Sequence, residues 1–194
     1  MEQEYVYELR IPKERVAVFI GRKGEMKRIV ENETRTRIDV DSKEGEIKVT
    51  GKDALTLLVA REIIRAVGRG FNPEIAMQLL KQDYAFELIS LSDYAHTKPA
   101  LERVKGRVIG AKGKSRTIIE NLTGCSLCVY GKTIGLIGEL EAVQIAKRAV
   151  ESLLGGSPHS HVYKFLEKKR REMHRMEQMD PADFLKDDVK DKVE

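Results

Sequence analysis

The chain has 194 residues, of which 41% are hydrophobic and 34% are charged, and its formal net charge at pH 7 is +4. This length suits one large domain or two small ones with packed cores. It has no apolar run near the roughly 18 residues of a membrane span, no signal-peptide pattern at its start, and with two cysteines no secreted disulfide scaffold. We therefore expect a cytoplasmic protein without a membrane partner.

Basic residues are concentrated in two segments. Between Thr97 and Arg116, seven Lys and Arg residues stand against one acid, and between Lys164 and Arg175 six stand against two acids. Such clusters on a balanced chain predict a polyanionic partner. For the second cluster a solvated helix face remains an equal alternative.

The first part of the chain combines strand and helix patterns. Apolar and polar residues alternate in YVYELRIP, which predicts a strand. Pro12 ends this strand and is suited to open a short helix. The predicted order is strand, helix, helix, strand, strand, helix, at residues 5–11, 13–20, 26–30, 38–40, 47–49 and 55–67.

The second part repeats this order. Gly21 and Gly110 lie 89 residues apart, whereas Gly51 and Gly138 lie 87 apart, so the second hairpin turn is expected to be two residues shorter. Six elements that match in order, with a length change only at a turn, indicate duplicated domains. The second set is predicted at residues 84–91, 99–109, 115–124, 125–130, 133–138 and 139–156.

These patterns divide the chain into five segments. We predict a first domain, a helical connector that begins at Pro73, a second domain, a basic C-terminal helix and an acidic, disordered tail. Their bounds are 4–70, 71–83, 84–156, 157–176 and 177–194.

Each half carries a Gly-x-x-Gly loop between its first two helices, with Arg22-Lys23 at the centre of one and Ala111-Lys112 at the centre of the other. Glycine adopts positive φ in a tight turn without steric cost. The missing Cβ atoms let a nucleic-acid backbone approach the main chain, and the N-terminal amides of the following helix form an anion site. The central cation is then placed to meet a phosphate.

This arrangement resembles the K-homology (KH) domain, whose GxxG loop clamps the backbone of about four single-stranded nucleotides. The long helix after the hairpin fits the type I arrangement. The resemblance implies an α+β fold with two tandem type I domains, each a three-stranded antiparallel sheet packed against three helices. It also implies an RNA-binding site made of Gly21, Arg22, Lys23, Gly24, Lys27, Arg28, Arg103, Lys105, Arg107, Gly110, Ala111, Lys112, Gly113, Lys114 and Arg116.

One position departs from the KH pattern. Many KH domains have an Ile three residues after the loop, where it lines the base groove, but this chain has Lys27 in the first copy and Arg116 in the second. Either these cations face solvent, or they add a contact to a phosphate or a base edge, for which Arg is well suited. The ordinary KH base preferences are therefore in doubt.

A narrower resemblance covers residues 4–176. The stretches GRVIGAKGKSRTIIENLTGCSL and AKRAVESLLGGSPHSHVYKFLE, with the basic helix after them, resemble the archaeal form of the partner-of-Nob or dimethylase-interacting family. That resemblance implies a ribosome biogenesis factor that binds near the 3′ end of 16S-type ribosomal RNA precursor. It further implies contacts with the endonuclease that trims this end, with the rRNA dimethylase and with a translation initiation factor.

The sequence motifs give little support to an enzymatic function. GKS at residues 113–115 is similar to the end of a P-loop, but the required first glycine falls on Val108. Cys125 and Cys128 form a CxxC within a predicted strand, where alternation sends them to opposite faces, unlike a redox or zinc motif. We find no set of nucleophile, base and orienting group. The chain is therefore predicted to be a non-enzyme without cofactor or metal.

The start of the basic helix holds two further pairs of interest. His159 and His161 are interpreted as helix-start residues or RNA contacts in preference to metal ligands. Tyr163 and Phe165 are interpreted as packing residues, with base stacking as the alternative.

Two other functions remain open. One alternative is a protein–protein adaptor with one degenerate KH copy, and the other is a KH regulator of messenger RNA or single-stranded DNA. Both loops are basic, which favours RNA for both. The denser basic approach of Arg103, Lys105 and Arg107 predicts that the second copy is the main site.

Overall fold

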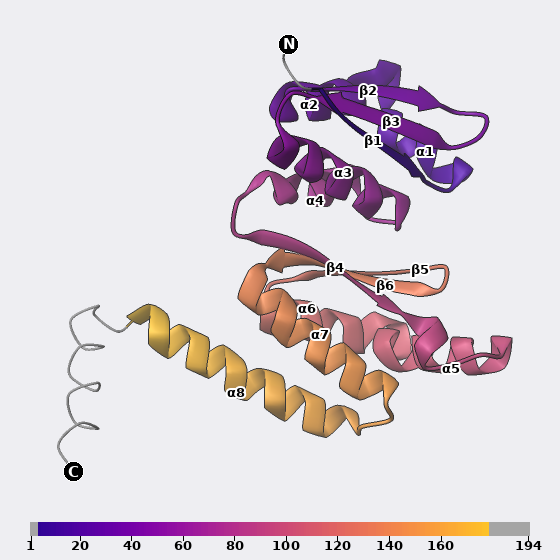
Figure 1. Cartoon of the computed structure of the whole chain (residues 1–194). Coiled ribbons are helices and arrows are strands. Elements are labelled where there is room, and N and C mark those ends of the chain that lie inside the picture. Colours follow the sequence, from indigo (N-terminus) through magenta and orange to yellow (C-terminus); the bar gives the residue numbers. More distant parts are fainter. Residues whose placement is uncertain (1–3, 179–194) are drawn as a thin grey trace.

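Two three-stranded sheets and the helices that cover them alternate in four layers (Figure 1). This arrangement comes from a computed structural model, which describes residues 4–178 and places side chains as far as residue 175. No helix within this part of the chain is long and apolar enough to cross a membrane.

The first half forms one sheet with three helices on one face. Its strands are antiparallel in the order β1-β3-β2, so the central strand pairs with both neighbours. The Asp53 side chain accepts a hydrogen bond from the N–H of Leu55 and caps the closing helix. The elements are β1 (Tyr5–Arg10), α1 (Lys13–Ile20), α2 (Glu25–Thr34), β2 (Thr36–Asp41), β3 (Glu46–Gly51) and α3 (Ala54–Gly68).

The second half has the same order, β4-β6-β5. Thr97 caps its first helix by accepting a hydrogen bond from the N–H of Ala100. The β5–β6 turn has two residues, 131–132, where the β2–β3 turn has four, 42–45, as predicted. The elements are α4 (Pro73–Ala76) in the connector, then β4 (Tyr84–Ser90), α5 (Lys98–Ile109), α6 (Lys114–Thr123), β5 (Ser126–Tyr130), β6 (Thr133–Glu139), α7 (Leu140–Leu154) and α8 (His159–Gln178).

The helices of the first half cover the outer face of the second sheet. Phe71 is 2% exposed, and its ring lies so close to Gly135 in β6 that an added Cβ would come within 2.5 Å of it. The ring also meets Phe86 of β4 edge to face, with centroids 5.9 Å apart. Ile137 belongs to the same apolar cluster. The two halves therefore share a core across this interface.

A polar contact joins the halves at the hairpin of the second sheet. The Tyr130 hydroxyl donates a hydrogen bond of 2.6 Å to Glu14 Oε1 in α1. This bond lowers the pKa of the Glu14 carboxyl and raises the pKa of the Tyr130 hydroxyl.

The two cysteines lie on opposite sides of the second sheet, as alternation predicts. Cys125 is buried in the core of the second half, whereas Cys128 packs against the core of the first. Burial raises the pKa of the Cys125 thiol to about 11, and it also raises the pKa of Cys128. Both thiols therefore stay protonated at neutral pH, which suits packing residues.

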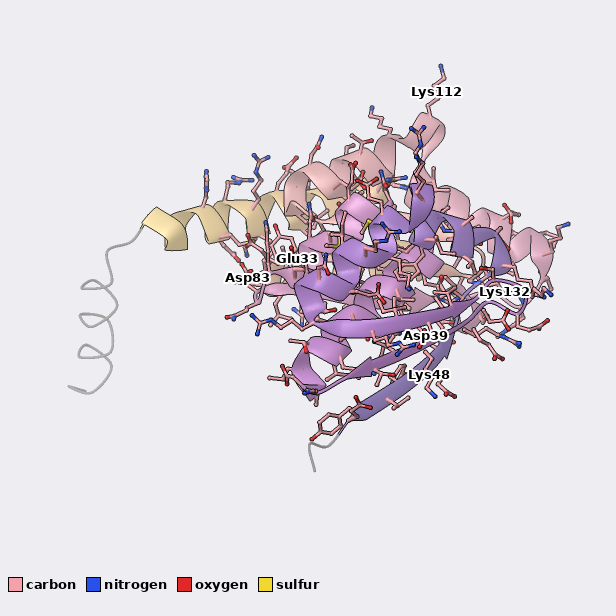
Figure 2. The ribbon with its side chains drawn as sticks, turned by 90° about the horizontal axis from the view of Figure 1, so that it is seen from above. Glu33, Asp39, Lys48, Asp83, Lys112 and Lys132 are labelled. Carbon is pink, nitrogen blue, oxygen red and sulfur yellow. The ribbon has the colours of Figure 1, made fainter. Side chains whose placement is uncertain are left out.

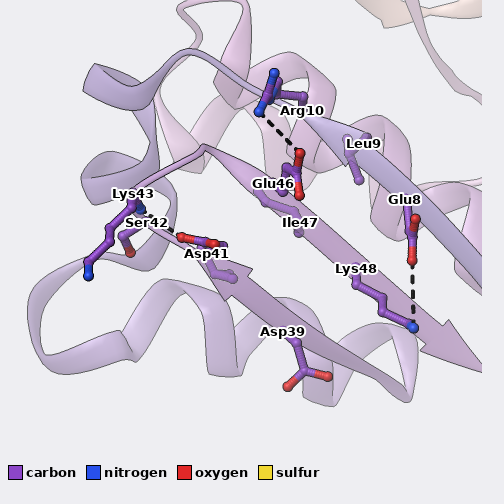
Figure 3. A pocket seen from close by; sticks show the side chains of 11 residues that line it. Glu8, Leu9, Arg10, Asp39, Asp41, Ser42, Lys43, Glu46, Ile47 and Lys48 are labelled. Atoms are coloured by element: carbon purple, nitrogen blue, oxygen red, sulfur yellow. Dashed lines mark hydrogen bonds and ion pairs between the residues drawn. The ribbon is translucent and has the colours of Figure 1, made fainter.

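The outer face of the first sheet is open and bears paired charges (Figure 3). Lys48 Nζ lies 3.6 Å from Glu8 Oε1, and Arg10 Nη2 lies 3.1 Å from Glu46 Oε1. The broad hollow over this face, about 1,090 Å³, is lined by such pairs. Because Lys48 and Arg10 are each paired with an acid, this face offers little concentrated positive charge to a polyanion.

Helix α8 packs along α6 and α7 through one apolar face. Val162 and Leu166 are buried, and Phe165 packs against the same core. The packing interpretation of Phe165 is thus confirmed. Helix α8 continues through Gln178, two residues into the predicted tail of 177–194, and residues 179–194 lie outside the described part of the chain.

The predicted fold class is confirmed. Each half is a three-stranded antiparallel sheet with its helices on one face, followed at the end by a separate helix. Predicted and observed elements differ by at most two residues at their ends, except that α2 extends four residues past the predicted range of 26–30, to Thr34. The polar residues 31–33 carry no apolar signal, so the periodicity does not include them.

Candidate nucleic-acid interface

The two glycine loops have the same backbone conformation. The first glycines, Gly21 and Gly110, have φ/ψ of 72°/−177° and 73°/173°. The third residues, Lys23 and Lys112, are left-handed with φ of 52° and 51°. The last glycines have φ of 76° and 79°. The duplication therefore preserves the conformation of these three loop positions, including two lysines in a conformation that non-glycine residues seldom adopt.

The first glycine of each loop is required by space as well as by torsion. Its φ/ψ region is accessible essentially to glycine alone. A Cβ on Gly21 would come within 2.8 Å of Met26 Cβ, and a Cβ on Gly110 would come within 2.7 Å of Ser115 N. In each half, the start of the second helix thus packs directly on this glycine.

The second glycine of each loop faces open space. A Cβ on Gly24 would meet only the end of the Arg28 side chain at 4.0 Å, and a Cβ on Gly113 would meet nothing within 4 Å among the residues that the structure describes. The main chain is therefore bare at this point. A nucleic-acid backbone has room to reach it.

These glycines are predicted to differ in their effect on stability. Gly110→Ala should lower the free energy of unfolding by about 2–3 kcal/mol, because strain and the clash with Ser115 add. Gly113→Ala should cost only about 1 kcal/mol, the strain of left-handed alanine. Denaturant unfolding of both variants measures the difference. Equal losses would contradict the open setting of Gly113.

The central side chains of both loops project into solvent. Arg22 and Lys23 are exposed in the first loop, and Lys112 is exposed in the second. Figure 2 shows Lys112 extending away from the edge of the molecule. No ion pair or hydrogen bond holds these side chains within residues 4–175, so their charge is available to a phosphate.

The helices that follow the loops differ in charge at their first residue. Helix α2 begins with Glu25, whereas α6 begins with Lys114, and both side chains are exposed. Helix N-termini attract anions through their free amides and their dipole. Lys114 adds to this attraction and Glu25 opposes it. On this basis we expect the second loop to be the more favourable phosphate site.

The unusual cations three residues after each loop are held by acids. Lys27 Nζ lies 3.4 Å from Glu31 Oε1, and Arg116 Nε and Nη2 each lie 3.2 Å from Glu120 Oε1. The same oxygens accept backbone N–H groups of the neighbouring strands, from Ile38 at 2.7 Å and from Leu127 at 2.9 Å. In both halves a carboxylate thus bridges the second helix and the outer strand.

Fewer of the basic side chains that precede the second loop are free to bind a ligand than the sequence indicates. Arg107 Nε donates to Leu153 O at 2.8 Å and its Nη2 donates to Ser157 O at 2.7 Å. Lys105 Nζ lies 2.9 Å from Glu102 Oε1. Arg103 is exposed and has no such partner among the described residues. Of the three cations, Arg103 is the one left for a phosphate, while the geometry favours a packing role for Arg107.

Sequence reasoning missed the counterpart of Arg107 in the first half. Arg15 Nε donates to Val67 O at 2.8 Å and its Nη2 donates to Phe71 O at 2.6 Å. Each arginine therefore binds a carbonyl at the end of the closing helix and another four residues later. Arg15 and Arg107 lie at different positions of the repeat, because the offset of 89 residues between the loops pairs Arg15 with Val104. An alignment of the two halves therefore does not reveal their common role.

The histidines are not arranged as metal ligands. His161 is exposed, and no group of three or more His, Cys, Asp or Glu residues that could hold a metal occurs within the described part of the chain. His159 Nε2 donates to Arg107 O at 2.8 Å. His159 thus joins the start of α8 to the end of α5.

Comparison with protein families agrees with the geometry. The model described as a eukaryotic-type KH domain, type I, matches residues 85–171, and the general KH domain model matches residues 6–66. The predicted type I arrangement is confirmed.

Relatives match across both halves. A KH domain-containing protein of Methanocaldococcus jannaschii is 48% identical over 171 residues, which cover 86% of this chain and 75% of that protein. The RNA-binding protein PNO1 of Oryzias latipes is 32% identical over 70% of this chain, which spans 58% of the length of that relative.

A solved structure is similar throughout. The complex of a/eIF2alpha, aDim2p and rRNA from Pyrococcus horikoshii contains a chain that is 44% identical, with a TM-score of 0.81. The match covers 87% of this chain and 96% of that one.

Proposed function

This chain belongs to the PNO1/Dim2p family of proteins with two KH domains, and on this basis we propose that it binds single-stranded RNA through its two GxxG loops. The observation that carries the proposal is the repeated loop geometry. In both halves a bare glycine backbone, exposed cations and a helix N-terminus converge at one edge.

The RNA we propose is the 3′ end of 16S-type ribosomal RNA precursor, and the role is in small-subunit biogenesis. Support comes from the relative named as an RNA-binding protein and from the solved complex whose name includes rRNA. The same complex includes a/eIF2alpha, which supports a translation initiation factor as a protein partner. The trimming endonuclease and the rRNA dimethylase are proposed partners by family resemblance.

A titration series tests this proposal. Purified protein is titrated against a twelve-nucleotide RNA with the 3′-terminal small-subunit rRNA sequence, a scrambled RNA and the matching DNA. We expect the rRNA sequence to bind most tightly. Equal binding of the scrambled RNA would contradict the proposed target, and equal binding of DNA would favour a single-stranded DNA regulator.

A protein–protein adaptor is the second candidate, because the related complex contains a protein subunit beside the rRNA. In that case no oligonucleotide binds above background in the same titration. We also propose domain bounds of 4–70 and 84–156, which limited proteolysis within residues 71–83 tests.

A further inference from the structure

A cavity of about 420 Å³ lies beside the second loop. It is open to solvent and is bordered by α5, the loop, the first turn of α6 and the start of α8. Its lining includes Arg103, Gly106, Lys114, Ser115, His159 and Tyr163. Its size falls in the range of roughly 300–1,000 Å³ that proteins use for small ligands.

A buried hydroxyl in this cavity lacks a partner. Ser115 is 2% exposed, and its Oγ makes no hydrogen bond with any group among the described residues. Leaving a buried polar atom unpaired destabilises a fold, so native proteins rarely do so without a reason. The equivalent residue of the first half is Met26, which has no such need. Of the two loops, only the second therefore adjoins a buried side-chain hydroxyl without a partner among the described residues.

The wall of the cavity contains a glycine in the last turn of a helix. Gly106 lies within α5, where glycine is unfavourable relative to alanine. A Cβ there would meet no atom within 4 Å beyond the backbone of its own helix. Its counterpart is Ala17 of α1, since Gly106 O and Ala17 O each accept the N–H of the first loop glycine. Packing within the chain thus does not explain why Gly106 lacks a side chain.

Two rings form the opposite side of the cavity. The hydrogen bond from His159 Nε2 to Arg107 O fixes the imidazole, and Tyr163 meets that ring at 61° with centroids 5.9 Å apart. Tyr163 is half-buried and lies outside the apolar core that Phe165 joins. The structure therefore separates the two aromatic residues of this helix, since one packs and the other lines the cavity.

We propose that this cavity receives one nucleotide of the RNA strand, next to the nucleotides clamped by the second loop. The base lies against Tyr163 over the bare face of Gly106, and the Ser115 hydroxyl bonds to its edge. Arg103 and Lys114, both exposed at the rim, meet its phosphate. The inference rests on the proposed RNA-binding function and extends it to a subsite on the α8 side of the loop.

A second hollow supports continuation of the strand on this side. It lies farther along the same two helices and is lined by Leu122 of α6 and, on α8, by three arginines, one acid and one histidine, namely Arg170, Arg171, Arg175, Glu167 and His174. Both hollows therefore lie along the seam between α6 and α8, which pack together. An RNA that leaves the cavity in this direction meets further positive charge.

Filling the cavity tests the proposal with a variant that should fold well. Gly106→Leu improves helix propensity, its Cβ meets no neighbour and the rest of its side chain extends into the hollow, so its Tm should equal or exceed that of the wild type. Affinity for the twelve-nucleotide rRNA sequence should fall by roughly tenfold or more, the loss expected for one stacked base. Affinity for a four-nucleotide RNA, which the loop clamps by itself, should not change. The matched control is Ala17→Leu, which should alter neither affinity.

Ser115→Ala provides a second, independent variant. It removes a hydroxyl that has no partner, so Tm should hold while affinity for the longer RNA falls. Unchanged affinity of both variants for the twelve-nucleotide RNA would overturn the proposal, as would an equal loss for the four-nucleotide RNA. Failure of the wild-type protein to bind either RNA would instead overturn the proposed function itself.

Discussion

Replacing Ala111 and Lys112 together by Asp should lower RNA affinity by about a hundredfold or more. Two carboxylates would then face a phosphate where a neutral side chain and a cation stand, and juxtaposed like charges cost several kcal/mol, with each 1.4 kcal/mol worth about tenfold. Both side chains are exposed, and such positions seldom change stability by more than about 0.5 kcal/mol. Asp also tolerates the left-handed conformation that Lys112 adopts. Binding titrations and thermal unfolding of the double variant measure both effects.

The same double substitution at Arg22 and Lys23 is the matched control. We expect a smaller loss of affinity, because Glu25 already weakens the first site whereas Lys114 strengthens the second. Equal or reversed losses would contradict the ranking of the two copies. A clear fall in Tm would instead assign the loop a structural role.

The fold was largely predictable because its signals are local. Helix α1 occupies the predicted residues 13–20, since Pro12 and Gly21 mark both ends. The order of the other elements followed from periodicity that occurs twice. A duplicated pattern is convincing because chance similarity would not repeat across six elements in register.

The stacking of the two halves is also reflected in the sequence, in the presence or absence of polar alternation along the central strand of each sheet. Strand β3, EIKVTG, alternates charged and apolar residues, as expected when one face is open. Strand β6, TIGLIGE, has no charge before its last residue, and Ile134 through Gly138 are all buried. A strand without polar alternation is covered on both faces, and here the first half supplies the second cover.

The pairing of individual cations was not predictable in this way. Arg107 and Arg103 belong to one basic run, yet the first is used by carbonyls of the chain and the second is exposed. The carbonyls that hold Arg107 lie 46 and 50 residues away, so only the three-dimensional arrangement brings them together. Charge counted along a sequence therefore overstates the charge available to a ligand.

The dependence of RNA affinity on salt should show how many clamps operate. In and beside each loop there are three exposed cations without partners among residues 4–175, namely Arg22, Lys23 and Arg28 in the first half and Arg103, Lys112 and Lys114 in the second. We expect about two or three neutralised phosphates per domain and one or two more at α8, so the total number of neutralised phosphates, Z, is about 5–8. The slope of the logarithm of the binding constant against the logarithm of the salt concentration should then be roughly −3.5 to −5.5, whereas one clamp gives about −1.5 to −2.

The length of the RNA supplies the independent arm of this measurement. Two linked weak sites raise apparent affinity through effective concentration, provided that one strand spans both. Affinity should therefore fall steeply below about eight nucleotides, twice the footprint of one clamp. The measurement is a salt series with a four-nucleotide and a twelve-nucleotide RNA. A shallow slope without length dependence would show that one copy binds RNA, and it would leave the other loop, despite its identical torsions, as a surface for a protein partner.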